Sequence, residues 1–491
     1  MSFKRFSERR LTSPTPHLPL YHLRPERNWI NDALGLTKAD GKHHLFFQYN
    51  PLGPDPGIKH WGHAATTDLV HWEILPVALS PTPNGPDEAG CWSGSITNLI
   101  NPPHLFYTGV THDARHGRTE AICLATGESE LRVWRKHSDV LIPGPPNDLD
   151  TVGFRDPFVW LDGDQWSLLV GSGIRGGGGA ILVYRSKDLL NWRYDGVFFS
   201  MASGAGGDDV GAMWECPQLI HLGDYHVLLL SIDNAVHPVL YVVGHVVGSR
   251  FSAERIGRLD MGPDFYAPTC DVEGGRAVLI AWSPEARSSD AQVAAGWAGV
   301  MTLPRDLTLG VDGQLCSSPV AELSRLRKEH WSAVSILLPG DGIGVPMPVG
   351  GSVFEVIATV RVGGASVIGL RIRKSPDGRE VTTFSVDPRT GGVIFDRSAS
   401  SLAPDTMHTV HETRDGWPPG ERIKLHLFAD ESIVELFIDD TVAVTGRIYP
   451  TRTESLGISA FAIGGNAEVE SIDIWQLDAA VPRDLGMRDS L

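Results

Sequence analysis

The sequence predicts an all-β protein, in which a five-bladed β-propeller is followed by a C-terminal β-sandwich. Helical periodicity is nearly absent from the 491 residues, which instead form short apolar or alternating runs such as 44–49 and 180–184, bounded by Gly, Pro, Asn and Asp. The 54 glycines and 34 prolines favour a chain with many tight turns. An internal repeat, described next, sets the expected number of blades.

One short pattern recurs at nearly equal intervals before residue 260. An acidic residue and a leucine precede Trp72, Trp134 and Trp192, which are 62 and 58 residues apart, and Phe251 marks a weaker copy 59 residues later. A repeat of about 60 residues filled with short strands is typical of a four-stranded propeller blade. The segment from about residue 20 to 320 then holds five blades. The alternative interpretation is a turn signature that recurs by chance.

The residue pattern changes beyond residue 318. Residues 319–331 are the most helix-like segment and predict a linker helix. We therefore expect a propeller over residues 1–318, a linker helix over 319–331 and a β-sandwich over 332–491. The sandwich is predicted from short strands separated by Asp-Gly, Gly-Gly and Asp-Asp turns, at 353–362, 366–373, 381–386, 391–396, 423–428, 432–438, 441–448, 456–463 and 469–477.

Composition excludes several classes of function. A net charge of −17 opposes binding to nucleic acids and to anionic membranes, and it suits a neutral polar substrate. The N-terminus lacks the apolar segment of a secretory signal, so we expect a cytoplasmic protein, or a secreted one if a leader precedes this sequence. The five cysteines and 19 histidines lack metal-site spacing. The GxGxxG pattern at 171–176 precedes an expected strand, whereas a dinucleotide-binding site has a helix after this pattern. No metal and no organic cofactor is expected.

Three carboxylates and one serine occupy nearly the same position in successive repeats. Asp32, Ser93, Asp156 and Glu215 lie 40, 41, 36 and 36 residues before the next repeat marker. In a propeller this position falls in the innermost strands, around the central channel. Residues far apart in the sequence are therefore expected to converge on one axial pocket. Taken singly, each carboxylate is equally consistent with an ordinary turn or surface position.

Converging carboxylates among aromatic residues indicate glycoside hydrolysis, because sugar rings stack on aromatic faces and carboxylates bind their hydroxyls. A retaining glycosidase needs an ionised nucleophile and a protonated acid about 5–5.5 Å apart. We expect Glu215, beside Trp214 and Met213, to hold the proton. The charge of Arg155 is expected to keep Asp156 ionised.

Taken in order, these motifs resemble those of glycoside hydrolase family 32, which contains invertases, fructan hydrolases and transfructosylases. The resemblance extends over almost the whole chain and implies a five-bladed propeller with a following sandwich. The matching strings are 29–35 (WINDALG), 46–51 (FFQYNP), 61–63 (WGH), 92–95 (WSGS), 155–157 (RDP), 215–217 (ECP), 264–268 (DFYAP) and 297–305 (WAGVMTLPR).

The resemblance also implies roles for individual residues. Asp32 would be the nucleophile that forms a fructosyl-enzyme intermediate, and Glu215 would act first as acid and then as base. Asp156 would bind furanose hydroxyls and stabilise the oxocarbenium-like transition state. The remaining sugar-binding residues implied are Asn31, Gln48, Trp61, Trp92, Ser93, Arg155 and Trp282.

Two residues depart from the family pattern. Ala33 and Leu34 replace the Pro and Asn that usually follow the nucleophile, which removes a polar group expected near the leaving-group subsite. We predict β-fructofuranosidase activity on sucrose, with transfructosylation to acceptor sugars at high sugar concentration. The alternatives are an exo-inulinase or levanase, a hydrolase of phosphorylated sucrose and, from a different class, a non-catalytic sugar-binding propeller. The expected partner is a small sugar, and the sequence predicts no oligomeric state.

Overall fold

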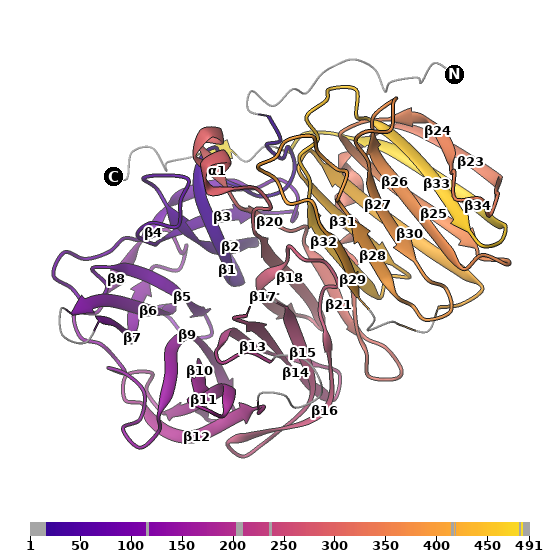
Figure 1. Cartoon of the computed structure of the whole chain (residues 1–491). Coiled ribbons are helices and arrows are strands. Elements are labelled where there is room, and N and C mark those ends of the chain that lie inside the picture. The colour runs from indigo at the N-terminus through magenta and orange to yellow at the C-terminus, as the bar shows by residue number, and fades with distance from the viewer. Residues whose placement is uncertain are drawn as a thin grey trace.

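The computed structural model describes residues 16–113, 117–202, 210–234, 238–413, 417, 419–480 and 483–484, and it is almost entirely β-structure. Five sheets follow one another in the first two thirds of the chain and surround a common centre (Figure 1). The first three contain β1 (Asn28–Ala39), β2 (Lys42–Asn50), β3 (His60–Thr66) and β4 (Glu73–Leu79); β5 (Gly90–Thr97), β6 (His104–Asp113), β7 (Gly117–Gly127) and β8 (Trp134–Lys136); and β9 (Thr151–Asp162), β10 (Gln165–Ile174), β11 (Gly178–Ser186) and β12 (Arg193–Ser200).

The fourth and fifth sheets complete this half of the molecule. They contain β13 (Trp214–Leu222), β14 (Tyr225–Ile232), β15 (Val239–Val247) and β16 (Arg250–Arg258), and then β17 (Tyr266–Glu273), β18 (Arg276–Ser283), β20 (Val300–Met301), β21 (Arg305–Leu309) and β22 (Leu315–Pro319). The short helix α1 (Ser289–Ala295) leads to β19 (Trp297–Ala298), which joins the first sheet beside β1. The first strands contact one another in the order β1, β5, β9, β13 and β17, and β17 contacts β1.

The repeated Leu-x-x-Trp pattern is a turn between the third and fourth strands of a sheet. Leu69, Leu131 and Leu189 all have positive φ angles, of 61°, 58° and 64°. In the first and third copies an aspartate accepts hydrogen bonds from the backbone N–H groups two and three residues later. The recurrence therefore has a common backbone geometry, and it marks the same position in each sheet. The count of five blades stays a prediction.

The C-terminal half is a sandwich of two six-stranded sheets. The nine strands predicted there are all present, and the three additional ones, β23, β24 and β29, each lie at the edge of a sheet. Edge strands carry weak hydrophobic patterns, and β24 contains two prolines, which a central strand does not tolerate. The sheets are β23 (Arg327–Leu338), β34 (Ala467–Leu477), β25 (Val353–Arg361), β30 (Arg422–Asp430), β31 (Ile433–Ile438) and β32 (Val442–Arg447); and β24 (Val345–Gly350), β33 (Gly457–Ile463), β26 (Val367–Lys374), β27 (Thr382–Val386), β28 (Val393–Asp396) and β29 (Val410–Thr413).

The linker is shorter than the helix expected over residues 319–331. A 3₁₀ helix covers only Ala321–Leu326, and the chain turns extended at Arg327. Residues from Arg327 onward pair with β34, so their backbone groups are used in a sheet and cannot continue a helix. Near the other end of the chain, β35 (Arg483–Asp484) pairs with β4, so the chain returns to the first sheet.

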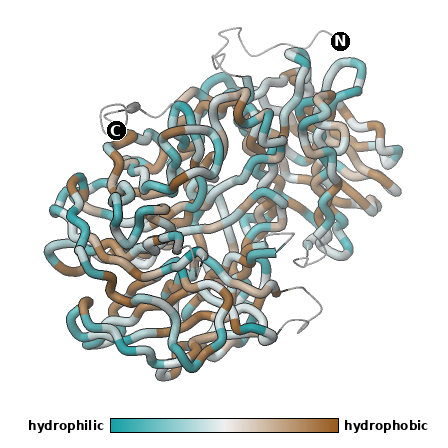
Figure 2. Tube along the Cα trace, turned by 60° about the vertical axis from the view of Figure 1, so that its left-hand side comes forward, coloured by the Kyte–Doolittle hydropathy of each residue, from teal (hydrophilic) through white to brown (hydrophobic). Residues whose placement is uncertain are grey.

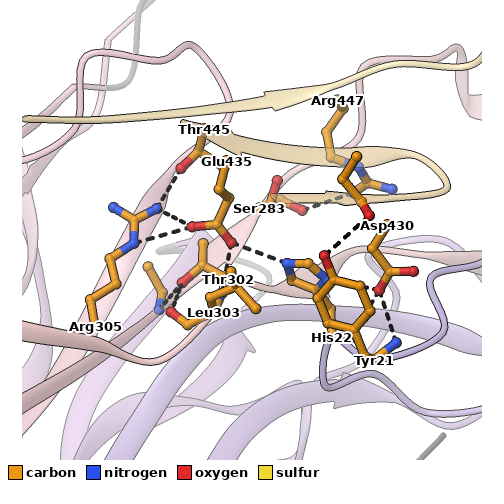
Figure 3. A network of polar contacts seen from close by, with 12 residues as sticks. Tyr21, His22, Ser283, Thr302, Leu303, Arg305, Asp430, Glu435, Thr445 and Arg447 are labelled. Carbon is orange, nitrogen blue, oxygen red and sulfur yellow. Dashed lines mark hydrogen bonds and ion pairs between the residues drawn. The ribbon is translucent and has the colours of Figure 1, made fainter. Parts of the chain in front are cut away.

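A buried polar network joins the two halves (Figure 3). Glu435 of the sandwich accepts hydrogen bonds from the Arg305 guanidinium, at 2.5 and 3.2 Å, and from Leu303 N at 2.7 Å. His22 lies between two carboxylates, with Nδ1 2.8 Å from Asp430 and Nε2 3.1 Å from Glu435. Arg305 also donates to Asp260 at 2.8 Å. We call these five residues, His22, Asp260, Arg305, Asp430 and Glu435, the interdomain cluster.

Hydrophobic and hydrophilic stretches alternate along the chain in both halves (Figure 2). Separate apolar cores fill the sandwich and the spaces between neighbouring sheets of the first half. Within the described residues, no helix is long and apolar enough to span a membrane.

Candidate active site

The first strands of the five sheets bring together the residues singled out from the repeat phase. Asp32 lies on β1, Ser93 on β5, Asp156 on β9 and Glu215 on β13. Hydrogen bonds and close contacts, given below, connect these side chains although up to 183 residues separate them (215 − 32). The predicted convergence on one site is therefore observed in the structure.

Three of these strands have a bulge at the same point. Arg155-Asp156-Pro157, Glu215-Cys216-Pro217 and Tyr266-Ala267-Pro268 each place a residue with positive φ directly before a proline: 63° at Asp156, 47° at Cys216 and 46° at Ala267. The strand register shifts at all three. Such strained, bulged positions redirect side chains and cluster at functional sites. Here they position the side chains of Arg155, Glu215 and Tyr266 for the contacts described below.

Asp32 is held by neutral donors. Ser93 Oγ donates to Asp32 Oδ2 at 2.5 Å, and Asn31 Nδ2 donates to Asp32 Oδ1 at 3.0 Å. Gln48 orders both donors, because it donates to Ser93 at 2.5 Å and accepts from Asn31 at 3.0 Å. Burial raises the pKa of Asp32, as does the charge of Glu215, while the Ser93 and Asn31 hydrogen bonds act in the opposite direction.

Asp156 lies beside Asp32, and both carboxylates are close to the thiol of Cys216. Cys216 N donates to Asp156 Oδ2 at 2.9 Å, and Cys216 Sγ lies 3.6 Å from Asp156 Oδ2 and 3.7 Å from Asp32 Oδ2. Burial raises the pKa of Asp156, and the charge of Glu215 adds to this effect. Two carboxylates therefore share a dry, crowded space in which their ionised forms are disfavoured.

Arg155 pairs with Glu215, which differs from the expectation that it serves mainly to keep Asp156 ionised. Its Nε and Nη2 donate to Glu215 Oε1 at 2.8 and 2.7 Å. The Arg155 charge does act to lower the pKa of Asp156, but burial and Glu215 outweigh it.

Tyr266 is a functional residue that the repeat argument did not select. Its hydroxyl donates to Glu215 Oε2 at 2.5 Å, so the two carboxyl oxygens of Glu215 have separate partners. The signal that identifies it is the third copy of the bulge pattern, Tyr266-Ala267-Pro268, which matches the Arg155 and Glu215 strings. Glu120 is a second such residue: its Oε1 accepts from Arg155 at 3.3 Å and thereby orients the guanidinium.

Tryptophans border this carboxylate cluster. Trp29 Nε1 donates to Asn31 Oδ1 at 2.9 Å, and its ring lies 6.0 Å from that of Trp282. Trp282 is also 6.4 Å from Tyr266, which places it beside the site as expected. Trp92 is half-buried, next to Ser93 on β5, with the Arg118 guanidinium 4.8 Å from its ring.

Two predicted positions have other surroundings. Trp61 is fully buried, and its Nε1 donates to the Trp92 carbonyl at 3.0 Å, so its contact with sugar stays a prediction. Leu34 is also buried, in the apolar core between the first two sheets, and therefore does not line the leaving-group side of the site. Its apolar side chain suits that core. Their neighbour His63 stacks on Phe46 and pairs with His44.

No group of three or more His, Cys, Asp or Glu with metal-binding geometry is found among the residues the structure describes. The five cysteines are free thiols. The three carboxylates of the site have different partners: Asp32 is held by hydroxyl and amide donors, Glu215 by an arginine and a tyrosine, and Asp156 by the backbone N–H of Cys216.

Comparisons with known proteins identify the family of the chain. The model of the "Glycosyl hydrolases family 32 N-terminal domain" matches residues 22–319, and that of the "Glycosyl hydrolases family 32 C terminal" domain matches residues 322–476. A sucrose-6-phosphate hydrolase of Zymomonas mobilis is 32% identical over 485 residues, covering 94% of this chain and 92% of its own.

Two solved structures are similar over nearly their whole length. Fructan 1-exohydrolase IIa of Cichorium intybus has a TM-score of 0.85 at 26% identity, covering 96% of this chain and 99% of its own. A β-fructofuranosidase mutant of Bombyx mori in complex with sucrose has a TM-score of 0.77 at 28% identity, covering 95% of each chain.

Proposed function

Since the chain belongs to glycosyl hydrolase family 32 and is a glycosidase, we propose that it is a retaining β-fructofuranosidase that cleaves sucrose into glucose and fructose. The observation that carries the proposal is the convergence of Asp32, Asp156 and Glu215 from three separate sheets on one site. The alternative hypothesis, a non-catalytic sugar-binding propeller, has no support, because all three carboxylates are present in the site and the relatives are enzymes. We also infer that each of the five sheets is one propeller blade, because their first strands contact one another in a ring.

Asp32 is the nucleophile in this proposal. Its two oxygens accept from Ser93 and Asn31, which fixes the carboxylate in one orientation without neutralising it. Attack on the anomeric carbon of the fructosyl unit forms a covalent ester, and hydrolysis of that ester completes a double displacement with retention of configuration.

Glu215 is the acid and then the base. It protonates the glycosidic oxygen as the leaving group departs, and it later removes a proton from the incoming water. Arg155 and Tyr266 contact different oxygens of this carboxyl, so its position is held in both protonation states. Asp156 does not react and stabilises the positive charge that develops on the sugar ring.

The substrate assignment is tested by incubating the purified protein separately with sucrose, inulin and levan and separating the products by chromatography. We expect rapid release of glucose and fructose from sucrose and slow attack on both polymers. Faster release of fructose from inulin or levan would instead assign a fructan exohydrolase. A glucose yield above the fructose yield at high sucrose would reveal transfructosylation, whereas equal yields at every concentration would exclude it.

Phosphorylated sucrose is a second candidate substrate, because the Zymomonas relative bears the name sucrose-6-phosphate hydrolase. The same assay with sucrose 6-phosphate decides between them by the ratio of the two kcat/KM values. In a solvent that contains methanol, the fructosyl group is transferred to methanol. The anomeric configuration of the methyl fructofuranoside formed, determined by NMR, tests retention directly.

A further inference from the structure

Lys59 is a buried cation at the edge of the active site to which the preceding mechanism gives no role. It directly precedes β3 and is 8% exposed. Its Nζ lies 5.3 Å from the ring centroid of Trp29, and it donates a hydrogen bond to the Pro56 carbonyl. In the part of the chain that the structure describes, no carboxylate oxygen lies within 4.0 Å of this Nζ.

An ammonium group has three N–H donors, and burying a cation without partners is costly. One donor of Lys59 is used by the Pro56 carbonyl, and the Trp29 face provides a cation–π contact. The charges of Asp32 and Asp55 are near enough to favour the protonated form, but burial lowers the pKa of Lys59 to about 8. Donor capacity is therefore left for a ligand at near-neutral pH.

The position of Lys59 in the site indicates which part of a substrate it meets. Ser93, Asp156 and Arg155 are at most 6% exposed and form the deep part of the site. Trp29 and Trp92 are only half-buried, and Leu52 and Ile58, in the loop before Lys59, are 77% and 48% exposed. In the proposed function a terminal fructosyl unit would occupy the deep part, and its leaving group would extend toward this rim.

Lys59 also lies beside the second rim tryptophan. The Lys59 carbonyl accepts from Cys91 N at 2.9 Å. A Cβ added to Gly90 would lie 2.9 Å from the Trp92 indole and 3.4 Å from Lys59 N, which shows how closely the three residues pack. The Lys59 backbone thus adjoins Trp92 and its ammonium adjoins Trp29, an arrangement suited to a sugar that stacks on an aromatic face while its oxygens accept hydrogen bonds.

We propose that Lys59 determines leaving-group specificity by donating hydrogen bonds from its ammonium to oxygen atoms of the leaving-group sugar. This inference rests on the proposed fructosidase function and assigns one residue of its leaving-group subsite. Lys59 is not a nucleophile or an acid here, and its contribution is to hold the departing sugar while the glycosidic bond breaks.

The test compares two fructosides that differ only in the leaving group. Sucrose releases glucose, whereas methyl β-D-fructofuranoside releases methanol, which has no further oxygen to bind. A hydrogen bond from a charged donor is worth about 1.5–3 kcal/mol, so we expect Lys59→Met to lower the ratio of kcat/KM for sucrose to that for the methyl fructoside by about tenfold or more. Inhibition by free glucose should weaken in parallel.

Two variants serve as controls. Lys59→Gln keeps N–H donors without the charge and should recover part of the ratio. Lys328→Met removes an exposed lysine on the sandwich, which pairs with Asp478 at 2.9 Å, and should leave the ratio unchanged. Thermal unfolding of all variants shows whether each is folded, and because the ratio is internal to one protein preparation, a loss of folded protein does not alter it.

The outcomes separate this inference from the proposed function. An unchanged ratio overturns the proposal: with equal losses on both substrates Lys59 acts through Asp32, and with no loss on either substrate it only supports the loop. If the wild-type protein cleaves neither fructoside, the proposed function falls and this inference falls with it. With sucrose 6-phosphate as a third substrate, a larger loss than on sucrose supports the proposal and assigns the phosphate as the acceptor, whereas an equal loss supports it and assigns hydroxyls.

Discussion

The protein buries two groups of carboxylates under opposite conditions. In the interdomain cluster, Glu435 receives the Arg305 guanidinium and a histidine, and although burial alone would raise the pKa of Glu435, these partners lower it. In the active site, Asp32, Asp156 and Glu215 have one arginine in hydrogen-bond contact, and burial raises the pKa of Asp32 and of Asp156. The partners of Glu435 stabilise its anionic form, whereas burial disfavours the anionic forms of Asp32 and Asp156.

The two groups differ in their partners and also in their exposure, because Glu435 is fully buried whereas Asp32 and Glu215 are only half-buried. A cluster in which every charge is paired fixes two domains relative to each other, and removing one member leaves another charge uncompensated. A cluster with excess negative charge stores free energy that a substrate or a proton can release, as active sites commonly do. The comparison predicts that mutations in the two clusters have inverse effects on activity and stability.

The largest effect is expected for Asp32→Asn. Loss of the nucleophile should lower kcat on sucrose by about 10⁴-fold or more, by analogy with other covalent mechanisms that lose a reacting group. The amide removes a buried charge, so the midpoint of thermal unfolding should stay the same or rise. Activity is measured by glucose release and stability by calorimetry. A variant that is inactive because it fails to fold would break the comparison.

The next largest effect is expected for Glu435→Gln. The amide carries no charge and must turn its NH₂ toward either Arg305 or His22, so one of these residues loses its acceptor on residue 435, and breaking a buried pair costs about 3–5 kcal/mol of unfolding free energy. The kcat of the folded fraction should be nearly unchanged. Chemical denaturation measures the loss.

A matched control for this variant lies on the surface of the same domain. Glu470→Gln removes an exposed carboxylate that pairs with Arg361 and Arg422. Solvent screens such pairs, so its unfolding midpoint should stay close to that of the wild type. A large loss of stability in the Glu470 variant, or no loss in the Glu435 variant, would contradict the view that buried ion pairs hold the two halves together.

A smaller effect concerns pH and Asp156. Because the pKa of Asp156 is raised in the folded state, the folded protein retains a proton that the unfolded chain releases, and stability falls as pH rises from about 4 through the raised pKa. Asp156→Asn abolishes this dependence, and Asn tolerates the positive φ at this position. We expect the variant to gain about 1 kcal/mol or more relative to wild type between pH 5 and pH 8. If the stability difference between variant and wild type is the same at pH 5 and pH 8, the pKa of Asp156 is not raised in the folded state, and the prediction is contradicted.

Much of the fold follows from local patterns. The nine sandwich strands are short segments between Asp-Gly, Gly-Gly and Asp-Asp turns, and the Leu-x-x-Trp turns repeat at 62 and 58 residues, so both are visible without a structure. The edge strands β23, β24 and β29 were missed because strands at an edge have one unpaired side and weaker patterning. The linker helix was overextended because helical propensity over 327–331 competes with pairing to β34, which lies 140 residues away in the chain.

The active site was predicted in part for a similar reason. The repeat phase identifies Asp32, Asp156 and Glu215, because equivalent positions in equivalent sheets face the same centre. It does not identify Tyr266, and the pairing of Arg155 with Glu215 was not predicted, because the bulges that set side-chain direction leave only an x-Pro dipeptide in the sequence. Leu34 is the converse case. Its departure from the family motif suggested a change near the leaving-group subsite, but the structure places this residue in an apolar core.

By itself, the sequence determined the all-β architecture, the spacing of the turns and the identity of the three carboxylates, because each depends on residues close together in the chain or on a regular repeat. Only the tertiary structure decided which carboxylate Arg155 binds, that Tyr266 contacts Glu215, and that Lys59 lies over Trp29. These contacts join side chains that are far apart in the sequence, and their geometry depends on bulges and packing that no local pattern specifies.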